Sequence, residues 1–281
     1  MSARRSLLFV PGARPDRFDK AQASGADMVC VDLEDAVAPD GKDAAREAAL
    51  AWLVEAASAT GPERVVRLNG LKTVAGLRDL SRAAELSPQA GLLFLPKVDG
   101  PEELEIADAI LTEAGSPAGL IALIESVDGL ENVQAIASAT SRLEMLLFGA
   151  VDLSAELGCD LEHEPLLYAR SRIVHAARRA GIGVLDVPSL AVRDNSVVRI
   201  EAEAAKSIGF SGKAAIHPAN VDAINTVFSP TEQELRKARE IMEVFAASPT
   251  GLVVIDGKLI EKPVVRKMEQ IVAAAKAAGM T

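Results

Sequence analysis

Short apolar segments recur along this chain at intervals of roughly 20–40 residues, about the length of one strand–helix unit. The eight segments span residues 6–11, 27–33, 64–69, 91–98, 119–125, 143–149, 181–187 and 212–218. Their uninterrupted apolar character is typical of parallel strands that are buried on both faces. Alanine- and charge-rich stretches with helical periodicity lie between them, as at residues 43–57, 101–115 and 195–209. This alternation predicts an α/β fold, a closed (β/α)8 TIM barrel rather than an open doubly wound sheet.

The residues after the eighth segment are surplus to a barrel. Residues 231–248 have the pattern of a long amphipathic helix, and residues 251–263 that of a short hairpin with an Asp-Gly turn. A further helical pattern covers residues 264–279. We therefore expect a barrel domain over residues 1–229 and a C-terminal helix–hairpin–helix arm over residues 230–281, which either covers the active site or reaches a neighbouring subunit.

Composition narrows the class of protein. Hydrophobic residues make up 49% of the 281 residues, enough for one large core, and the formal net charge of −10 argues against general binding to nucleic acids or membrane surfaces. The two cysteines, Cys30 and Cys159, form no disulfide framework and have no metal-site spacing. The apolar stretch near the N-terminus is too short for a signal peptide, and no run approaches the length of a membrane span. A soluble cytoplasmic protein is expected.

Acidic residues follow two of the predicted strands. Glu125 follows the fifth apolar segment and Asp152 follows the sixth. Because the carboxyl ends of barrel strands meet at one mouth, the two carboxylates can converge on one ion. Two carboxylates with water and a chelating substrate suit Mg²⁺, and the presence of only three histidines argues against zinc. The alternative is that one acid caps a helix or forms a salt bridge.

Further charged residues surround the same predicted mouth. Arg67 ends the third segment and offers a planar fork to a substrate carboxylate, or else it bridges to Asp32 or Asp35. Asp32, Glu34 and Asp35 lie so close in sequence that their like charges need a nearby cation or arginine. We therefore expect these acids either to surround the metal or to orient Arg67.

Four basic residues at other strand ends have two interpretations each. Arg14 and Arg17 follow the first segment, where they either meet a phosphate group or remain solvated. Lys97 either forms a Schiff base or, more commonly for such a lysine, an ion pair. His217, which precedes Pro218, either contacts a ligand or begins the next helix.

Together these segments resemble the HpcH/HpaI aldolase and citrate lyase β-subunit-like family, especially its CoA-thioester lyases. The segments that carry the resemblance are RSLLFVPGARPDRFDKA, DMVCVDLEDAV, VVRLNG, LPKVDGPEEL, ALIESVDGLEN, LLFGAVDLSAELG, the run at residues 209–218, and DGKLIEKPVV. They occur in the expected order over nearly the whole chain.

The resemblance implies a (β/α)8 barrel with Mg²⁺ bound at the positions of Glu125 and Asp152. It implies that Arg67 binds the carboxylate of a 2-oxo acid such as glyoxylate or pyruvate, and that Glu34 and Asp35 lie around the metal and its waters. Members of the family bind an acyl-CoA across the barrel mouth, close to the loop after the first strand and to the last strand. They assemble as homotrimers or hexamers, with the arm of one chain over its neighbour's site.

One position departs from the family pattern. The C-terminal hairpin of the CoA lyases usually carries an aspartate, thought to be the general acid/base at the acyl-CoA α-carbon, where this chain has Glu261. The added methylene displaces the carboxylate, and a displacement of about an ångström can lower a rate on the order of 100-fold.

The resemblance implies a Mg²⁺-dependent carbon–carbon lyase that cleaves a 3-hydroxy-3-carboxyacyl-CoA, such as malyl-CoA or citramalyl-CoA, to a 2-oxo acid and acetyl-CoA. Two alternatives stay open. One is a citrate lyase β subunit that acts on a citryl-acyl carrier protein. The second, motivated by Glu261, is a protein that binds CoA esters with little turnover.

Overall fold

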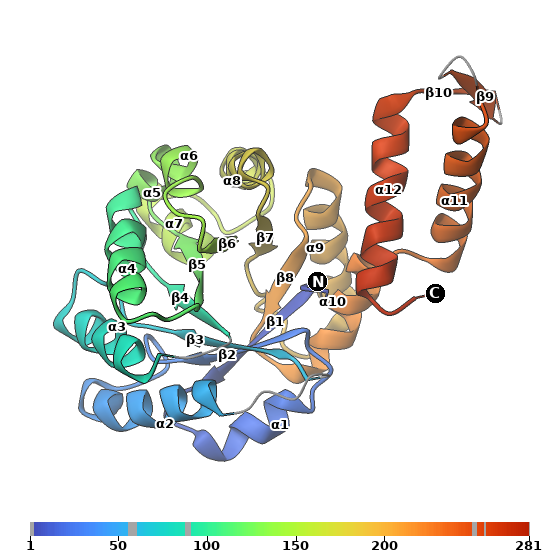
Figure 1. Cartoon of the computed structure of the whole chain (residues 1–281). Coiled ribbons are helices and arrows are strands. Elements are labelled where there is room, and N and C mark those ends of the chain that lie inside the picture. The colour runs from blue at the N-terminus through green and yellow to red at the C-terminus, as the bar shows by residue number, and fades with distance from the viewer. Residues whose placement is uncertain (1–2, 56–60, 88–90, 249–251, 256, 281) are drawn as a thin grey trace. The chain divides into compact units, whose positions relative to one another are not determined.

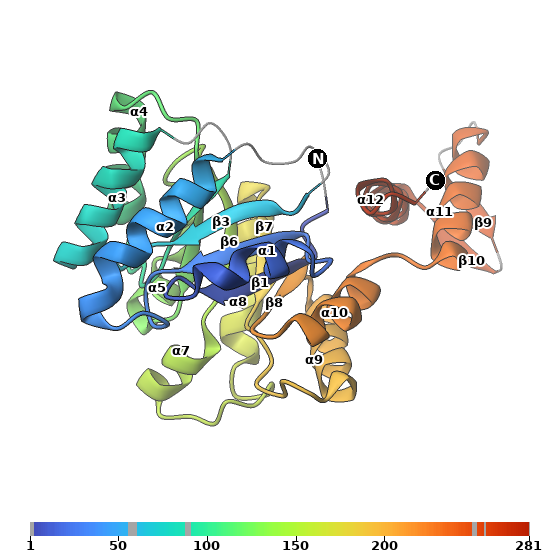
Figure 2. The ribbon, with the colours of Figure 1, turned by 90° about the horizontal axis from the view of Figure 1, so that it is seen from below.

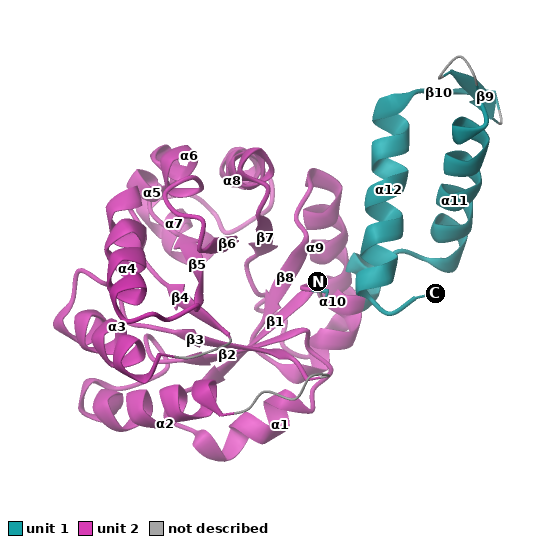
Figure 3. Cartoon of the chain, in the orientation of Figure 1, with its two compact units in different colours: residues 1–3, 226–281 teal, residues 4–225 magenta. Residues whose placement is uncertain are grey.

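A computed structural model of the chain describes residues 3–55, 61–87, 91–248, 252–255 and 257–280. The chain divides into two compact units (Figure 3). Residues 4–225 form the larger unit, and residues 226–281 together with residues 1–3 form the smaller one.

Parallel strands close into a barrel in chain order in the larger unit (Figure 1). The strands are β1 (Ser6–Pro11), β2 (Met28–Asp32), β3 (Glu63–Arg67), β4 (Leu92–Leu95), β5 (Gly119–Ile124), β6 (Leu143–Phe148), β7 (Gly183–Asp186) and β8 (Gly212–Ala215). Each falls within its predicted segment, apart from one extra residue at the start of β3. Pairing of β1 with both β2 and β8 closes the ring, so the predicted eight-stranded barrel is confirmed.

Helices flank the strands on the outside of the barrel (Figures 1 and 2). They are α1 (Phe18–Gln22), α2 (Lys42–Val54), α3 (Val74–Leu86), α4 (Pro101–Glu113), α5 (Val127–Glu131), α6 (Val133–Ile136), α7 (Ala150–Leu157), α8 (Leu167–Ala180), α9 (Asn195–Ile208) and α10 (Val221–Phe228), with 3-10 turns at η1 (Pro15–Arg17), η2 (Pro39–Gly41) and η3 (Pro218–Asn220). Local signals account for several starts, since the Thr73 and Asp194 side chains cap α3 and α9. Among the described helices, none has the length and apolar character to cross a membrane.

Alternate strand positions fill the barrel interior with apolar side chains, as the two-residue period of a strand requires. This core comprises Leu7, Met28, Cys30, Val65, Leu92, Phe94, Ile121, Leu123, Met145, Leu147, Leu185 and Ala214. One period further towards the carboxyl end, the same faces carry Asp32 on β2, Arg67 on β3 and Glu125 after β5. The pleat therefore places a charged layer directly above the apolar one.

The smaller unit contains the predicted helix–hairpin–helix arm. It consists of α11 (Glu232–Ala246), the antiparallel strands β9 (Val253–Ile255) and β10 (Lys258–Ile260), and α12 (Lys262–Ala277). A capping box of Thr231 and Glu234 starts α11. Asp256 of the predicted Asp-Gly turn lies outside the described residues, whereas Gly257 has a φ of 72°, which favours glycine.

Candidate active site

A cavity of about 390 Å³ opens at the carboxyl ends of the strands. Its charged lining consists of Asp32, Asp35, Arg67, Glu125 and Asp152. Its apolar lining consists of Phe9, Val10, Pro11, Ala36, Leu123, Leu147, Phe148, Gly149, Val151, Val187, Pro188 and Ile216. The charged side chains thus share one concave surface with an apolar floor, the usual character of a small-molecule site.

Glu125 is the most strongly perturbed acid of this cavity. It directly follows β5 and is buried, and its Oε1 accepts a hydrogen bond of 2.9 Å from the Lys97 backbone N–H. Lys97 has a φ of 53°, a left-handed conformation that is uncommon for a residue with a side chain. Burial, helped by the neighbouring carboxylates of Asp152 and Glu34, raises the pKa of Glu125 to about 8.

Asp152 lies in a helix and not at a strand end. The predicted segment placed it at the end of the sixth strand, but β6 ends at Phe148 and Asp152 falls in the first turn of α7, where it is exposed. The helix N-terminus favours a negative charge at this point. Asp152 nevertheless lines the same cavity as Glu125, and its carboxylate contributes to the raised pKa of Glu125. That the two carboxylates converge on one ion stays a prediction.

Gly149 makes this arrangement sterically possible. A Cβ atom at Gly149 would lie 2.3 Å from the Glu125 Cβ and 3.1 Å from its Oε2. Because Ile124 pairs with Phe148 across β5 and β6, Glu125 stands directly opposite Gly149. Any side chain at this position would therefore displace the Glu125 carboxylate.

The paired carboxylates fit a hard divalent cation. Burial raises the pKa of Glu125, with smaller contributions from the carboxylates of Asp152 and Glu34, and a bound cation favours the ionised form against these effects. Across the described residues, no cluster of three or more His, Cys, Asp or Glu side chains could hold a metal ion. Mg²⁺ fits such a site, since it needs only one or two carboxylates and completes its coordination with water and substrate oxygens.

Arg67 is held in a fixed orientation at the edge of the cavity. It pairs across the sheet with Asp32, and its Nε and Nη2 donate to the two Asp32 oxygens at 2.7 Å each. Its Nη1 lies 3.0 Å from Glu34 Oε2, and its guanidinium stacks 5.2 Å from the centre of the Phe9 ring. The predicted bridge to Asp32 is therefore present, and its hydrogen bonds use two of the five guanidinium N–H groups. Binding of a substrate carboxylate by Arg67 stays a prediction.

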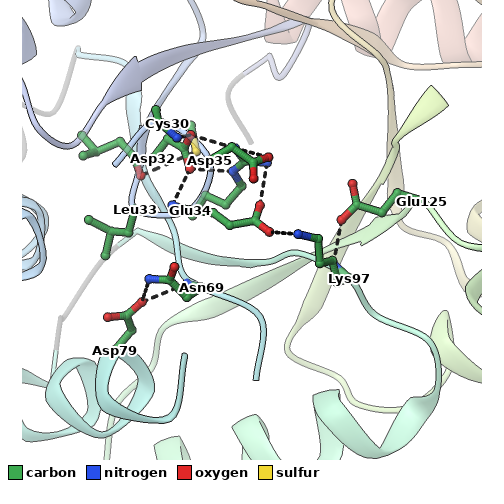
Figure 4. A network of polar contacts seen from close by, with 12 residues as sticks. Cys30, Asp32, Leu33, Glu34, Asp35, Asn69, Asp79, Lys97 and Glu125 are labelled. Atoms are coloured by element: carbon green, nitrogen blue, oxygen red, sulfur yellow. Dashed lines mark hydrogen bonds and ion pairs between the residues drawn. The ribbon is translucent and has the colours of Figure 1, made fainter. Parts of the chain in front are cut away.

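Glu34 connects Arg67 to Lys97. Figure 4 shows its carboxylate beside the Lys97 side chain. Its Oε1 lies 2.7 Å from the Lys97 ammonium, which shows the ion pair that was one interpretation of this lysine. Burial raises the pKa of Glu34, while its two cations oppose that rise. The hydrogen bond that Lys97 donates to Glu34 raises the pKa of Lys97, so the amine stays protonated and is a poor Schiff-base nucleophile.

The remaining predicted residues lie further out. Asp35 is exposed and lines the cavity, with its Oδ2 3.6 Å from Arg67. Arg14 and Arg17 are exposed in the turn after β1 and do not line the cavity, and Arg14 forms a two-bond pair with Asp16. The His217 Nδ1 accepts the Ala219 N–H and so begins η3, as one of its two interpretations stated. Contacts of these four residues with a ligand stay predictions.

Sequence inspection missed the residues that support this layer from behind. Lys42 and Arg46 of α2 contact Asn69 and Asp79, and Gly149 makes room for Glu125. The sequence signals were a glycine at the end of the sixth apolar segment and two basic residues four apart at the start of a predicted helix.

The fold and the cavity define a class of protein: a (β/α)8-barrel enzyme with a carboxylate pair and a fixed arginine at its catalytic mouth. The family model of HpcH/HpaI aldolase/citrate lyase matches residues 5–218. This chain therefore belongs to the HpcH/HpaI aldolase/citrate lyase family, as the sequence resemblance implied.

Curated relatives match the chain over almost its whole length. It is 32% identical over 290 residues to citrate lyase subunit beta of Leuconostoc mesenteroides subsp. cremoris (98% of this chain, 94% of the relative). It is 34% identical over 278 residues to (3S)-malyl-CoA thioesterase of Cereibacter sphaeroides (97% and 95%) and 34% identical over 307 residues to L-malyl-CoA/beta-methylmalyl-CoA lyase of the same species (97% and 94%). Lyase names among these relatives agree with the predicted carbon–carbon lyase.

Solved structures share the fold. RipC from Yersinia pestis is 39% identical and has a TM-score of 0.72, covering 83% of this chain and 98% of that chain. CitE from Mycobacterium tuberculosis in complex with magnesium, acetoacetate and coenzyme A is 29% identical with a TM-score of 0.81, covering 99% and 98%. The complex of the same protein with magnesium and pyruvate is 31% identical with a TM-score of 0.69, covering 82% and 92%.

Proposed function

We propose that this chain is a Mg²⁺-dependent lyase that cleaves, or in reverse forms, a 3-hydroxy-3-carboxyacyl-CoA such as malyl-CoA or citramalyl-CoA. The observation that carries the proposal is the cavity in which Glu125, Asp152 and Arg67 meet. The magnesium, coenzyme A and 2-oxo acid in the Mycobacterium tuberculosis complexes support the same ligands here.

The cavity side chains divide into three tasks. Glu125 and Asp152 would hold Mg²⁺, which would supply a Lewis acid to the substrate. Arg67, already oriented by Asp32, binds the substrate carboxylate through N–H groups that Asp32 does not use. Asp35, exposed at the cavity, accepts the hydroxyl proton as the carbon–carbon bond breaks; Glu34 is less suited because Arg67 and Lys97 engage both of its oxygens.

Bond cleavage leaves the acyl-CoA portion as a thioester enolate that needs a proton at its α-carbon. We assign this proton to Glu261, the residue that precedes α12. Its side chain is exposed and makes no hydrogen bond or ion pair with other described residues, so the carboxylate is available to a ligand. In the condensation direction the same carboxylate removes that proton.

A thioesterase is a second candidate, since one relative at 34% identity carries that name. Hydrolysis of malyl-CoA releases free coenzyme A and malate, whereas the lyase reaction releases a 2-oxo acid and leaves the thioester intact. A lyase acting on a citryl-acyl carrier protein is a third candidate, in line with the citrate lyase relative. A protein that binds CoA esters with little turnover is the fourth.

One assay separates these functions. Purified protein is incubated with Mg²⁺ and malyl-, β-methylmalyl- and citramalyl-CoA, with phenylhydrazine detecting 2-oxo acid and a thiol reagent detecting free coenzyme A. We expect metal-dependent 2-oxo acid without free thiol from at least one ester. Free thiol without 2-oxo acid would instead establish the thioesterase. If folded protein binds the esters but releases neither 2-oxo acid nor free coenzyme A, the result contradicts the lyase. It then favours a carrier-protein substrate or a protein that only binds the esters.

A further inference from the structure

Lys42, the first residue of α2, makes contacts that the proposed chemistry does not use. Its ammonium donates to the Leu33 and Glu34 carbonyl oxygens at 2.9 Å each and to Asn69 Oδ1 at 2.6 Å. These bonds occupy all three donors of the ammonium. All three acceptors are neutral oxygens, so hydrogen bonds and not an ion pair hold the lysine side chain in place.

The contacts fall on the segment that presents Glu34 to the cavity. Two consecutive carbonyls, those of Leu33 and Glu34, point to one ammonium, which requires a turn in place of extended backbone. The N–H groups of the same segment are bound by Asp32, which accepts the Glu34 N–H at 2.9 Å and the Ala36 N–H at 3.2 Å. The segment is therefore held through both its carbonyl and its N–H groups. Its Glu34 side chain extends to Arg67 and Lys97.

The third acceptor of Lys42 is itself fixed. The Asn69 backbone N–H and Nδ2 donate to Asp79 Oδ2 at 2.9 and 2.6 Å (Figure 4), so its Oδ1 must face Lys42. Asp79 is fully buried and receives the Arg46 Nε at 2.5 Å. Arg46 lies one turn after Lys42 on the same helix, so the contacts form a closed circuit from α2 through Asn69 and α3 back to α2.

We propose that Lys42 is a positioning residue, which holds the turn after β2 so that the Glu34 carboxylate bridges Arg67 and Lys97. Lys42 does not line the cavity, and it acts through the backbone of Leu33 and Glu34. Loss of its ammonium frees that turn and lets Glu34 move, whereas the strands below keep their own hydrogen bonds. The effect on turnover rests on the proposed function, but the effect on the turn does not.

Hydrogen exchange tests the structural half of this proposal without any substrate. Lys42→Met keeps the apolar stem and removes the donors, Lys42→Arg keeps charge and donors, and Lys20→Met is the control because Lys20 is exposed on α1. We expect amide exchange at residues 33–37 to rise about 10-fold or more in Lys42→Met alone, with strand amides and the melting temperature nearly unchanged. Unchanged exchange at residues 33–37, or an equal rise in every strand, overturns the proposal.

Once a CoA ester that the enzyme cleaves has been identified, kinetics test the effect of Lys42 on turnover. We expect kcat of Lys42→Met to fall by about 10- to 100-fold, with KM for the ester changed less and with partial recovery in Lys42→Arg. Wild-type kcat in a variant whose turn exchanges rapidly overturns the positioning role. If Lys42→Met does not fold, Lys42→Gln replaces it under the same criteria. A wild-type enzyme without turnover rejects the lyase proposal while the exchange result still decides the role of Lys42.

Discussion

Gly149 is the single residue on which the carboxylate pair most directly depends. Its backbone conformation is open to any residue, so its importance comes from contact and not from conformational freedom. The Cβ of an alanine would overlap the Glu125 Cβ at 2.3 Å, a separation that real Cβ atoms do not adopt. The neighbouring strand cannot retreat without breaking its ladder with β5.

We therefore expect Gly149→Ala to fold and to lose about 100-fold or more in kcat/KM and in Mg²⁺ affinity, because Glu125 leaves its position. Calorimetric titration with Mg²⁺ measures the binding loss directly. Gly41→Ala is the matched control, since its new Cβ would meet only Val37 at an ordinary 3.5 Å. Wild-type Mg²⁺ affinity in Gly149→Ala would refute this view of the site.

Glu125 also makes stability depend on pH. Its pKa rises from 4.5 to about 8 on folding, so the metal-free protein gains stability from the protonated carboxyl below about 4.5 and loses it as the pH rises towards 8. Relative to Glu125→Gln, the unfolding free energy of the wild type should fall by up to about 1.4 kcal/mol per pH unit within that window.

Denaturant unfolding of both proteins at pH 5, 6, 7 and 8 without metal measures this difference. Saturating Mg²⁺ should stabilise the wild type increasingly as the pH rises, because the cation binds the ionised carboxylate. A constant difference between the two proteins over this range would show that Glu125 titrates normally.

At the scale of elements, a second charged cluster joins β7 and β8 to the helices behind them. Asp186 ends β7 and is buried, with its Oδ1 bonded to Arg170 of α8 and its Oδ2 2.7 Å from Lys213 of β8. Lys213 is also buried and lies 3.2 Å from Glu201 of α9. The carboxylate thus neutralises two cations between the barrel and its helical layer.

Asp186→Ala should destabilise the protein by about 3–5 kcal/mol, because it leaves buried Arg170 and Lys213 without their shared partner. Chemical denaturation measures the change. The exposed pair of Arg82 and Glu47 gives the control, and Glu47→Ala should leave the unfolding midpoint unchanged within error. A change in Asp186→Ala no larger than in that control would mean that the cluster is hydrated.

At the scale of the whole molecule, the family resemblance implies that Glu261 serves a neighbouring subunit in a trimer or hexamer. Glu125→Gln and Glu261→Gln should then each be inactive, since each removes one carboxylate of every site. Mixed in equal amounts and allowed to exchange subunits, they should recover about a quarter of the wild-type activity, because one site in four receives both carboxylates.

The same mixture without subunit exchange is the control for this experiment, and sedimentation gives the oligomeric state. Full subunit exchange without any recovery would place Glu261 in the site of its own chain or outside the reaction.

The sequence by itself determined the layout of this protein. Burial on both faces leaves parallel strands apolar, so the eight segments were visible one by one, and the pleat then directs Asp32, Arg67 and Glu125 to one mouth. The C-terminal arm was also visible, because helical and hairpin patterns continue after the eighth strand segment. Such patterns are local, and a local pattern can be read without knowing what packs against it.

Only the tertiary structure decided which charged and polar side chains pair with one another. Whether Arg67 is bridged by Asp32 depends on the β2–β3 register, and the place of Glu125 depends on the absence of a side chain at Gly149. The circuit from Lys42 to Asp79 depends on the packing of two helices. A polar side chain has several possible partners at similar free energy, and the geometry of the assembled elements selects among them.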